Sequence, residues 1–296
     1  MYDGVSVIIP TARTDHSTFD YLSSVAQSLG NFDGEKELVI AADREVGGTD
    51  FLRAIVAKYG FVRILEGEIR KGSARTRLEA LREAQHQVVL FTDDDCVVPA
   101  EWVTQMYHAV MHHGVVAGNL KALCPENPYC SVDAYVDQLR IRSVDELGNA
   151  KYISFPNFGV LRQCLPEELF FASRLNTAED IDLACRLRLM GIPIWFDESI
   201  VIETEYPSTF KGLVRRKIKH AMGIAHLRFR LGPKDCGQVG LAETPARMLR
   251  RWVGLSLQAP LPVTQRAYML LANAAYCVAL AHYDRVFARI LSKEGG

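Results

Sequence analysis

In Val88-Val89-Leu90-Phe91-Thr92-Asp93-Asp94-Asp95, a short run of β-branched and aromatic residues ends in three consecutive acids. An apolar run of this length, bounded by polar residues, is typical of a buried strand. Because side chains alternate along an extended chain, we expect Asp93 and Asp95 to point to the same side. Carboxylates this close repel one another, so the pattern fits a hard divalent cation, Mg²⁺ or Mn²⁺. A solvated acidic turn before the next helix is the alternative interpretation.

Similar apolar runs precede this stretch, and helical patterns separate them. We expect strands at residues 5–10, 37–42, 61–65 and 87–91, and helices at residues 19–29, 50–59 and 73–84. This alternation predicts an α/β fold with a doubly wound, mostly parallel sheet and helices on both faces. Ligands of such sheets bind beyond the carboxyl ends of the strands. The first candidates for a binding site are therefore Thr11, Asp43 and the three acids at 93–95.

Composition and missing motifs narrow the class of protein. The 296 residues are 49% hydrophobic, which is enough for a folded core and excludes wholesale disorder. Seven cysteines without zinc-like spacing argue against a disulfide scaffold or a zinc site. Residues 1–10 lack the pattern of a secretory signal, so we expect a cytoplasmic chain. The absence of G-x-G-x-x-G after the first strand, and of a P-loop motif, argues against dinucleotide oxidoreductases and P-loop enzymes.

Charge is distributed unevenly along the chain, although its formal net value is only −1. Residues 1–205 carry a balance of −12, whereas residues 206–283 carry +10. This split suggests an acidic catalytic or binding body with a basic, apolar appendage. Helices with solvated arginines are the alternative interpretation. The acidic body argues against a nucleic-acid partner.

A second acidic cluster opens a later helix. The pattern predicts a helix over residues 178–190, with Thr177 as its N-cap and Gly191 at its C-cap. Short strands are expected at residues 194–196 and 199–202, and residues 124–155 are expected to be irregular or helical. Negative charge in a first turn is favoured by the helix dipole, so plain capping would explain Glu179 and Asp180. The same position also keeps a carboxylate ionised and ready to act as a general base. Arg186 follows Asp182 by one turn on this helix, and we expect the two to pair.

These pieces, in this order, resemble the family 2 glycosyltransferases with a GT-A fold over about residues 3–225. The resemblance is carried by the first strand with Thr11, the second strand up to Asp43, and a set of short motifs. These motifs are Gly72-Ser73-Ala74-Arg75-Thr76, Phe91-Thr92-Asp93-Asp94-Asp95, Pro99-Ala100-Glu101-Trp102, Pro156-Asn157-Phe158-Gly159-Val160-Leu161-Arg162, Ala178-Glu179-Asp180-Ile181-Asp182-Leu183-Ala184-Cys185-Arg186-Leu187 and Tyr206-Pro207-Ser208.

The resemblance implies transfer of a sugar from a nucleotide-diphosphate donor, with a bias to UDP-sugars, to an acceptor hydroxyl with inversion. It implies synthesis of a polysaccharide or glycoconjugate. It also implies that Asp93 and Asp95 are the outer members of a D-x-D motif, with Asp93 on the ribose or sugar and Asp95 on a Mg²⁺ or Mn²⁺ ion. Asp180 would be the catalytic base, and Glu179 would shape the acceptor pocket. The implied donor-binding residues are Pro10, Thr11, Asp43, Arg75, Asp93, Asp94, Asp95 and Lys217.

Three departures from the family pattern concern the donor and metal sites. A single Asp43 stands where the family has a pair of aspartates, and Thr76 stands where it has an asparagine. The family's metal-ligating histidine after the last strand is absent, and Glu203 or Glu205 is the candidate replacement. The alternative is a metal held by Asp95 and the diphosphate alone.

The sequence of the C-terminal part predicts basic helices. Residues 206–234 contain eight Lys and Arg residues and no acid. A basic residue within 215–219 could hold the leaving diphosphate, and Lys217 is our candidate for this role. No apolar run reaches the roughly 20 residues of a bilayer span. Arg247, Arg250 and Arg251 before Trp252 suggest an interfacial helix on the cytoplasmic face of a membrane, which would suit a lipid-linked acceptor. An oligomerisation module, or packing on the catalytic body, is the other interpretation.

We therefore expect a catalytic domain over residues 1–225 and a helical extension over residues 226–296. Within the catalytic domain, residues 1–115 would bind the nucleotide sugar and residues 116–225 the acceptor, a sugar or a lipid-linked molecule. A non-catalytic nucleotide-sugar-binding scaffold is the alternative function. A sugar-phosphate nucleotidyltransferase is less well supported, because no glycine-rich signature follows Pro10.

Overall fold

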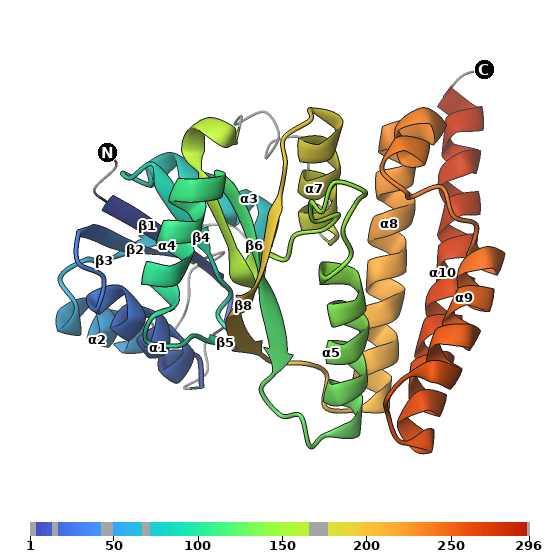
Figure 1. Ribbon diagram of the computed structural model, residues 1–296, viewed down its shortest axis with the longest axis horizontal. Coiled ribbons are helices and arrows are strands. Elements are labelled where there is room, and N and C mark those ends of the chain that lie inside the picture. Colours follow the sequence, from blue (N-terminus) through green and yellow to red (C-terminus); the bar gives the residue numbers. More distant parts are fainter. Residues whose placement is uncertain (1–3, 14–16, 43–49, 67–71, 166–176, 295–296) are drawn as a thin grey trace.

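The structure is a computed structural model that describes residues 4–13, 17–42, 50–66, 72–165 and 177–294. Within these residues an eight-stranded sheet forms the centre (Figure 1). In chain order its strands are β1 (Gly4–Thr11), β2 (Glu35–Ala42), β3 (Val62–Glu66), β4 (Val88–Phe91), β5 (Cys96–Val97), β6 (Val115–Ala122), β7 (Phe158–Leu161) and β8 (Trp195–Thr204). The helices are α1 (Ser17–Gly30), α2 (Asp50–Lys58), α3 (Ser73–Glu83), α4 (Trp102–His113), α5 (Pro128–Ile141), α7 (Glu179–Leu189), α8 (Phe210–Gln238), α9 (Pro245–Gln258) and α10 (Val263–Glu294), with short 3₁₀ turns at Phe155–Asn157 and Arg162–Cys164.

The sheet is mostly parallel, as the sequence predicts. Its order is β3-β2-β1-β4-β7-β6-β8-β5. The four strands β3, β2, β1 and β4 run parallel, and β6 runs parallel to β8. Only β7 and the short β5 pair antiparallel to their neighbours. Because β1 and β4 are adjacent and parallel, their carboxyl ends meet, and the acidic stretch follows one of them.

The central strands are buried on both faces, which explains their continuous apolar runs. Along β1, Val7 and Ile9 belong to the core under α1, α2 and α4, whereas Ile8 belongs to the core under α3 and α7. Trp102 is fully buried in the first of these cores, and Phe91 in the second. Alternation along the strands thus fills two apolar layers, one on each face of the sheet.

Two local expectations are corrected by the structure. Helix α7 begins at Glu179, and the residue at its N-cap is Ala178 rather than Thr177. The two short strands expected around residues 194–202 form one strand, β8, whose register with β6 shifts after Gly118. Such a bulge interrupts the sequence pattern without ending the strand.

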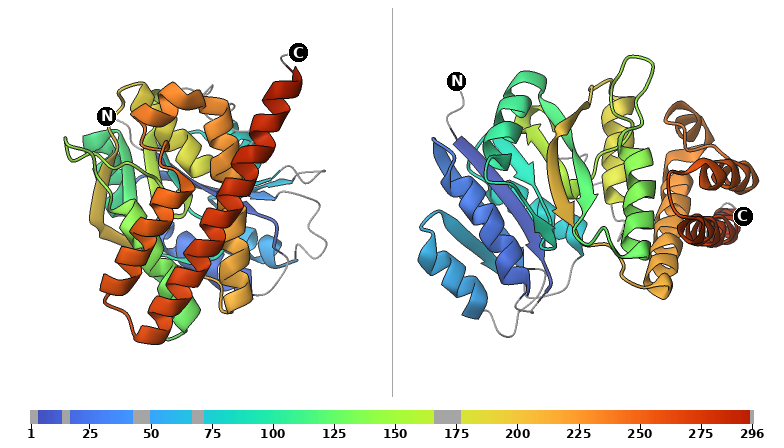
Figure 2. Two further views of the ribbon diagram at one scale, coloured as in Figure 1. Left: turned by 90° about the vertical axis from the view of Figure 1, so that its right-hand side faces the viewer. Right: turned by 60° about the horizontal axis from the view of Figure 1, so that its bottom comes forward.

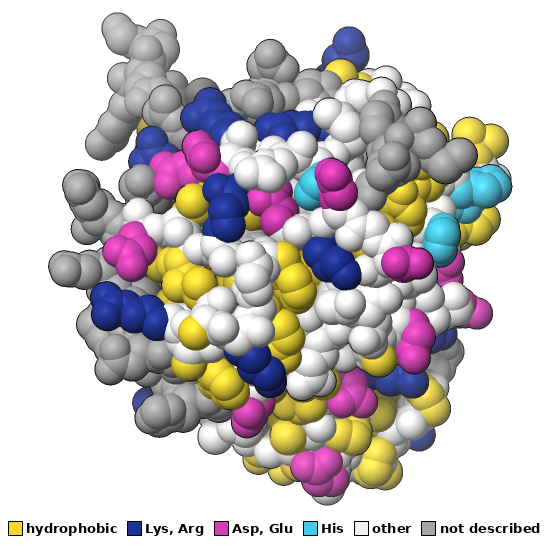
Figure 3. Space-filling model, turned by 90° about the vertical axis from the view of Figure 1, so that its left-hand side faces the viewer, with side chains coloured by type: hydrophobic (Ala, Val, Ile, Leu, Met, Phe, Trp, Pro, Cys, Tyr) yellow, Lys and Arg dark blue, Asp and Glu magenta, His cyan; other side chains and the backbone are white. Residues whose placement is uncertain are grey.

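The basic C-terminal part forms a layer of helices beside α5 and α7 (Figures 1 and 2). Helix α8 runs across residue 225, where the sequence predicts a boundary, and bends at Gly232, whose φ is 75°. The apolar side chains of α9 and α10 pack against α8, and Trp252 of α9 contacts two of the core clusters. None of the helices in the described part of the chain is both long and apolar enough to cross a membrane. The opposite side of the molecule, where β3 and α2 lie, mixes basic, acidic and apolar side chains (Figure 3).

Candidate active site

The acidic stretch after β4 is tied to the end of β1 by hydrogen bonds. The backbone amide of Thr92 donates to the carbonyl of Ile8 at 3.2 Å. The hydroxyl of Thr11 donates to Oδ2 of Asp94 at 2.6 Å. Burial raises the pKa of Asp94, although this hydrogen bond opposes the change. The structure thus brings together Thr11 and Asp94 from the predicted donor site, and Pro10 precedes Thr11 in β1.

A guanidinium group from the loop after β1 lies among the carboxylates at this end of the sheet. Arg13 is 3.2 Å from Asp95, 3.5 Å from Asp94 and 3.0 Å from Glu205. Tyr21 of α1 donates its hydroxyl to the other oxygen of Glu205 at 2.6 Å. No sequence pattern indicates Arg13, whereas Glu205 is one of the two predicted replacements for the missing metal-ligating histidine. Three carboxylates around one guanidinium make a site that attracts cations.

The charge of Asp95 is only partly compensated. Burial and the neighbouring charge of Asp93 raise the pKa of Asp95 to about 7, while Arg13 acts in the opposite direction. In the described residues, no three His, Cys, Asp or Glu side chains are arranged to hold a metal ion. The donor set nevertheless fits a hard divalent cation, because Asp93, Asp94, Asp95 and Glu205 together carry more negative charge than Arg13 and Arg77 neutralise. The other ligands of such an ion would have to come from bound phosphate groups or water.

Arg77 joins the two acidic clusters. Its guanidinium contacts Asp93 of the first cluster and lies 3.1 Å from Oε1 of Glu179 at the start of α7. The side chain is 4% exposed and lies over the ring of Phe155 at 4.4 Å from its centroid. Ser73, on the same helix as Arg77, donates its hydroxyl to the same oxygen of Glu179 at 2.7 Å. Helix α3 therefore connects the end of β4 with the beginning of α7.

Arg75, the predicted donor-binding arginine, and Arg77 lie on different faces of α3. Arg75 is exposed on α3, whereas Arg77 faces inward together with Ala74, Leu78 and Leu81. These four inward residues follow the i, i+3, i+4, i+7 spacing of a helix face. The helical period alone could therefore have distinguished the buried arginine from the exposed one.

Asp180 lies in the first turn of α7, beside Glu179. It accepts a hydrogen bond from its neighbour, the backbone amide of Ile181, at 2.8 Å. Burial raises the pKa of Asp180 to about 6, and the charge of Glu179 adds to this effect, while Arg140 and Arg77 oppose it. A carboxyl group with a pKa near 6 loses its proton at neutral pH and can then accept one from a hydroxyl group.

The backbone before Asp180 is held in an unusual conformation. Ala178 has a φ of 64°, the only positive value among the described non-glycine residues. Helix α8 approaches this turn closely at Gly223, where a Cβ atom would lie 2.7 Å from the carbonyl oxygen of Thr177. Only glycine permits this approach. The contact between α7 and α8 thus fixes the direction in which α7, and with it Asp180, begins.

Lys217 of α8 lies in an ion-pair network with α5. Its Nζ atom is 2.6 Å from Asp133, and Arg216 is 3.1 Å from both Asp133 and Asp137. The lysine side chain is buried. Burial opposes ionisation of Asp137, yet the charges of Arg140, Arg216 and Lys217 outweigh it and lower the pKa. To contact a donor, the Lys217 amine would have to leave its ion pair with Asp133 and bind the diphosphate instead.

The remaining predicted site residues are placed as follows. Asp43 lies outside the described residues. Glu203 is exposed on β8 next to β5, while Glu205 is the residue that shares Arg13 with Asp95. The predicted pair of Asp182 and Arg186 is confirmed, at 2.8 Å.

Two family models match the chain. The family model described as glycosyl transferase family 2 matches residues 6–165. The model described as glycosyl transferase family group 2 matches residues 88–290. No curated protein matches the sequence.

Two solved structures share the fold at low sequence identity. A mannosyltransferase from Pyrobaculum calidifontis, in complex with GDP-Man and Mn²⁺, has a TM-score of 0.66 and 17% identity over 96% of this chain and 87% of that chain. Residues 1–349 of TarS from S. aureus, in complex with UDP-GlcNAc, have a TM-score of 0.55 and 18% identity over 96% of this chain and 91% of that chain. At these identities the likeness establishes the fold.

Proposed function

The chain belongs to glycosyltransferase family 2, and on this premise we propose that it moves a sugar from a nucleotide-diphosphate donor to an acceptor hydroxyl with inversion. Asp180 is the general base, and a divalent cation on the diphosphate is held at Asp95 with Asp93. The product belongs to a polysaccharide or glycoconjugate. Binding of GDP-Man and of UDP-GlcNAc by the two structural relatives supports a nucleotide-sugar donor, and we retain UDP-sugars as the first choice.

The observation that carries this proposal is the bridge made by Arg77. It links Asp93, on the donor side, to Glu179, next to the proposed base. In sequence these acids are far apart, and one buried cation holds them at the same site. A donor carboxylate and a base at a common site are what a single displacement requires, because donor and acceptor must be held in line.

In the proposed donor site, Pro10 and Thr11 line the nucleotide at the end of β1, and Asp43 contacts the base. Asp94 supports this wall through its hydrogen bond with Thr11. Asp93 meets the ribose or the sugar, and Arg75 and Lys217 remain proposed contacts to the donor. Arg77, which no sequence motif indicated, supports this site by holding Asp93.

The proposed cation is Mg²⁺ or Mn²⁺, and the Mn²⁺ in the Pyrobaculum relative supports a divalent ion. Asp95 and Asp93 would hold it, with Glu205 as the third carboxylate near Arg13. When bound, the ion neutralises the charge that develops on the departing diphosphate. Arg13 already neutralises part of the acidic charge and would have to share Asp95 with the ion.

The proposed catalytic role of Asp180 follows from its environment. Its pKa of about 6 leaves it ionised at neutral pH, yet basic enough to take a proton from the acceptor hydroxyl. The hydrogen bond from the amide of Ile181 orients the carboxylate. Glu179 is held by Ser73 and Arg77, so it can line the acceptor side without rotating freely. No covalent intermediate is needed for an inverting transfer.

The acceptor is proposed to be a sugar or a lipid-linked molecule, and peripheral contact with the cytoplasmic face of a membrane is part of this proposal. The exposed apolar side chains Val253 and Leu257 on α9 support such a contact. The packing of Trp252 against the neighbouring helices supports the other interpretation, in which α9 is mainly structural.

The experiment that tests the function is a donor panel. Purified protein is mixed with a set of nucleotide sugars in the presence of Mn²⁺, Mg²⁺ or EDTA, and released nucleotide and the thermal midpoint are measured. We expect one donor to raise the midpoint and to be turned over only with a divalent ion. The Asp95→Asn variant should lose the metal dependence together with turnover. Donor binding without turnover under any condition would favour the non-catalytic scaffold instead.

A further inference from the structure

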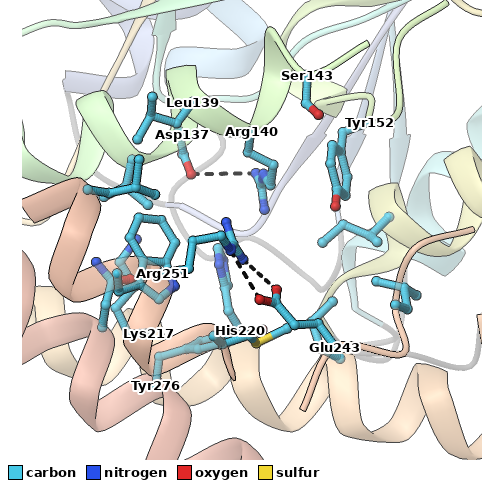
Figure 4. A pocket seen from close by; sticks show the side chains of 18 of the residues that line it. Asp137, Leu139, Arg140, Ser143, Tyr152, Lys217, His220, Glu243, Arg251 and Tyr276 are labelled. Atoms are coloured by element: carbon cyan, nitrogen blue, oxygen red, sulfur yellow. Dashed lines mark hydrogen bonds and ion pairs between the residues drawn. The ribbon is translucent and has the colours of Figure 1, made fainter. Parts of the chain in front are cut away.

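A cavity of about 410 Å³ lies between α5, α8, α9 and α10, beside the start of α7 (Figure 4). Ile181, the residue after the proposed base, is part of its lining. Arg140 of α5 also lines it, and the charge of Arg140 lowers the pKa of Asp180. Arg77 acts on Asp180 from the donor cluster. The cavity therefore lies beside the first turn of α7, which carries Asp180 and Glu179, the partner of Arg77.

One wall of the cavity carries the guanidinium group of Arg140, and only part of its hydrogen-bonding capacity is satisfied. Arg140 is 3.5 Å from Asp137, whose other oxygen is 3.1 Å from Arg216. The Nε atom of Arg140 is buried and, among the residues that the structure describes, has no hydrogen-bond partner. A buried guanidinium nitrogen without a partner is costly, and a bound anion would supply the missing acceptor.

The opposite wall contributes a second guanidinium. Arg251 of α9 points into the cavity and pairs with Glu243 at 2.8 Å (Figure 4). Its side chain is 49% exposed, so this pair lies on the open side of the cavity. The hydroxyl of Tyr152 also points inward, and both arginines act on it electrostatically. Two cations from different helices thus face a space that also holds a neutral hydrogen-bond donor.

Much of the remaining lining is apolar. Leu139, Ile224, Leu241, Met248, Trp252 and Leu255 line the cavity around the polar groups. Burial and the nearby charges of Arg216 and Arg140 lower the pKa of His220, another lining residue, well below its ordinary value. The imidazole is therefore neutral at physiological pH and adds no charge of its own. Apolar walls with a guanidinium group on each of two helices, one of them with an unpartnered nitrogen, suit a ligand that has an apolar and an anionic part.

We propose that this cavity is the acceptor site, and that the acceptor is an amphiphile with a phosphate or carboxylate group held by Arg140 and Arg251. Its apolar part lies against Trp252 and its neighbours, and its hydroxyl group reaches Asp180. Only the identification of the ligand as the acceptor rests on the proposed function. The binding of an anionic amphiphile in the cavity can be tested without any donor.

The test is calorimetric titration of the full chain, without donor, using decyl phosphate, decyl maltoside and inorganic phosphate below micellar concentrations. We expect decyl phosphate to bind at least about tenfold more tightly than either of the other two probes. Arg140→Gln and Arg251→Gln should each lower the affinity for decyl phosphate by about tenfold and leave the affinity for decyl maltoside unchanged. The matched controls are Arg142→Gln at the C-cap of α5 and Arg250→Gln on α9, which remove exposed arginines and should bind like the wild type.

Equal binding of decyl phosphate and decyl maltoside, or unchanged affinity in both arginine variants, would overturn the proposal. Arg251 is half-exposed, so its variant provides a test even where Arg140→Gln fails to fold. Co-sedimentation with phosphatidylglycerol vesicles then distinguishes the sources. Arginine-dependent binding to vesicles supports a membrane lipid, and binding to decyl phosphate alone supports a soluble amphiphile.

The two proposals fail separately. Arginine-dependent binding of decyl phosphate, in a protein that turns over no nucleotide sugar, would contradict the proposed function and leave the anionic site standing. Turnover of a nucleotide sugar without arginine-dependent binding of decyl phosphate would contradict the anionic site and leave the proposed function standing.

Discussion

Arg77 is the residue that makes one site out of two acidic motifs. It is almost fully buried, and it contacts Asp93 and Glu179 at the same time. Removing one partner of a buried ion pair leaves charge without compensation, which costs more than the pair itself contributes. At the residue scale, therefore, this side chain has a larger predicted effect than any exposed arginine nearby.

Replacing Arg77 with methionine should lower the free energy of unfolding by about 2–4 kcal/mol, because two carboxylates lose their cation. Donor affinity should fall as well, since Asp93 is no longer held. The matched control is Arg75→Met on the exposed face of α3, for which we expect a stability change within about 0.5 kcal/mol. Urea unfolding and donor titration measure both effects. Equal losses of stability in the two variants would mean that the bridge is unimportant, whereas donor affinity is compared with the wild type alone, because Arg75 is itself a proposed donor contact.

Asp180 should make the folded protein less stable at neutral pH. Its pKa is about 6 in the fold and 3.8 in the reference state, so folding opposes its ionisation. The cost is absent below about pH 4, grows between pH 4 and pH 6, and is complete above pH 6. The Asp180→Asn variant should therefore be about 1–3 kcal/mol more stable than the wild type at pH 8, with a smaller difference at pH 5.

Urea unfolding at pH 5, 6 and 8 measures this difference. Asp33→Asn, which changes an exposed aspartate, serves as the control and should leave stability within about 0.5 kcal/mol at every pH. A variant that is less stable than the wild type at pH 8 would show that the Asp180 charge is favourable in the fold.

The residues that sequence reasoning identified are those in short, consecutive motifs. Asp93, Asp95 and Asp180 stand beside apolar runs whose ends are easy to recognise, although their catalytic roles remain predictions. Arg13 and Arg77 were missed because their partners are distant in sequence. Helical spacing would have marked Arg77 as inward-facing, whereas nothing local indicates that Arg13 meets Glu205.

At the scale of elements, the contact between α7 and α8 positions the proposed base. Gly223 lets α8 lie against Thr177 and Ala178, and Ala178 takes a left-handed backbone conformation just before α7. The sequence suggested Thr177 as a polar N-cap, which is wrong because tertiary packing determines this turn. Local capping preferences carry no information about a neighbouring helix that is close enough to require glycine.

The Gly223→Ala variant should lower the free energy of unfolding by about 1–3 kcal/mol and also reduce turnover, because the added methyl group must push α8 away from the start of α7. Gly237 on the same helix provides the control, since a Cβ there would meet no atom within 4 Å. Gly237→Ala should leave turnover unchanged and alter stability by at most about 1 kcal/mol, in the stabilising direction. Thermal unfolding and nucleotide release compare the two variants. Wild-type turnover in Gly223→Ala would contradict the positioning role.

The strands were predicted more completely than the helices that cover them. Central strands such as β1 and β4 are buried on both faces, so their apolar runs are continuous and easily recognised. By contrast, α5 was not resolved from the irregular region before it, because it carries buried acids that pair with α8. Its buried face mixes these acids with apolar residues, so the periodicity of apolar residues is interrupted there.

At the scale of the whole molecule, the charge imbalance along the chain is partly compensated by ion pairs between the acidic body and the basic C-terminal part. Acids of α5 in the acidic body pair with Arg216 and Lys217 of the basic part. Within the C-terminal part itself, Arg228 of α8 lies 3.0 Å from Asp284 of α10. The basic C-terminal helices are thus partly a counterpart of the body rather than a free cationic surface. How the chain divides into domains stays a prediction, since α8 runs through the boundary expected at residue 225.

The most direct measurement of the central claim is the rate of nucleotide release by the wild type and by Asp180→Asn, with water as the acceptor. The donor found in the panel would be used at saturation with Mn²⁺ at pH 7.5, and donor affinity would be measured for both proteins. We predict a release rate at least about 100-fold lower in the variant, with donor affinity within about twofold of the wild type, because only proton removal is lost. Release at the wild-type rate by Asp180→Asn would contradict the account.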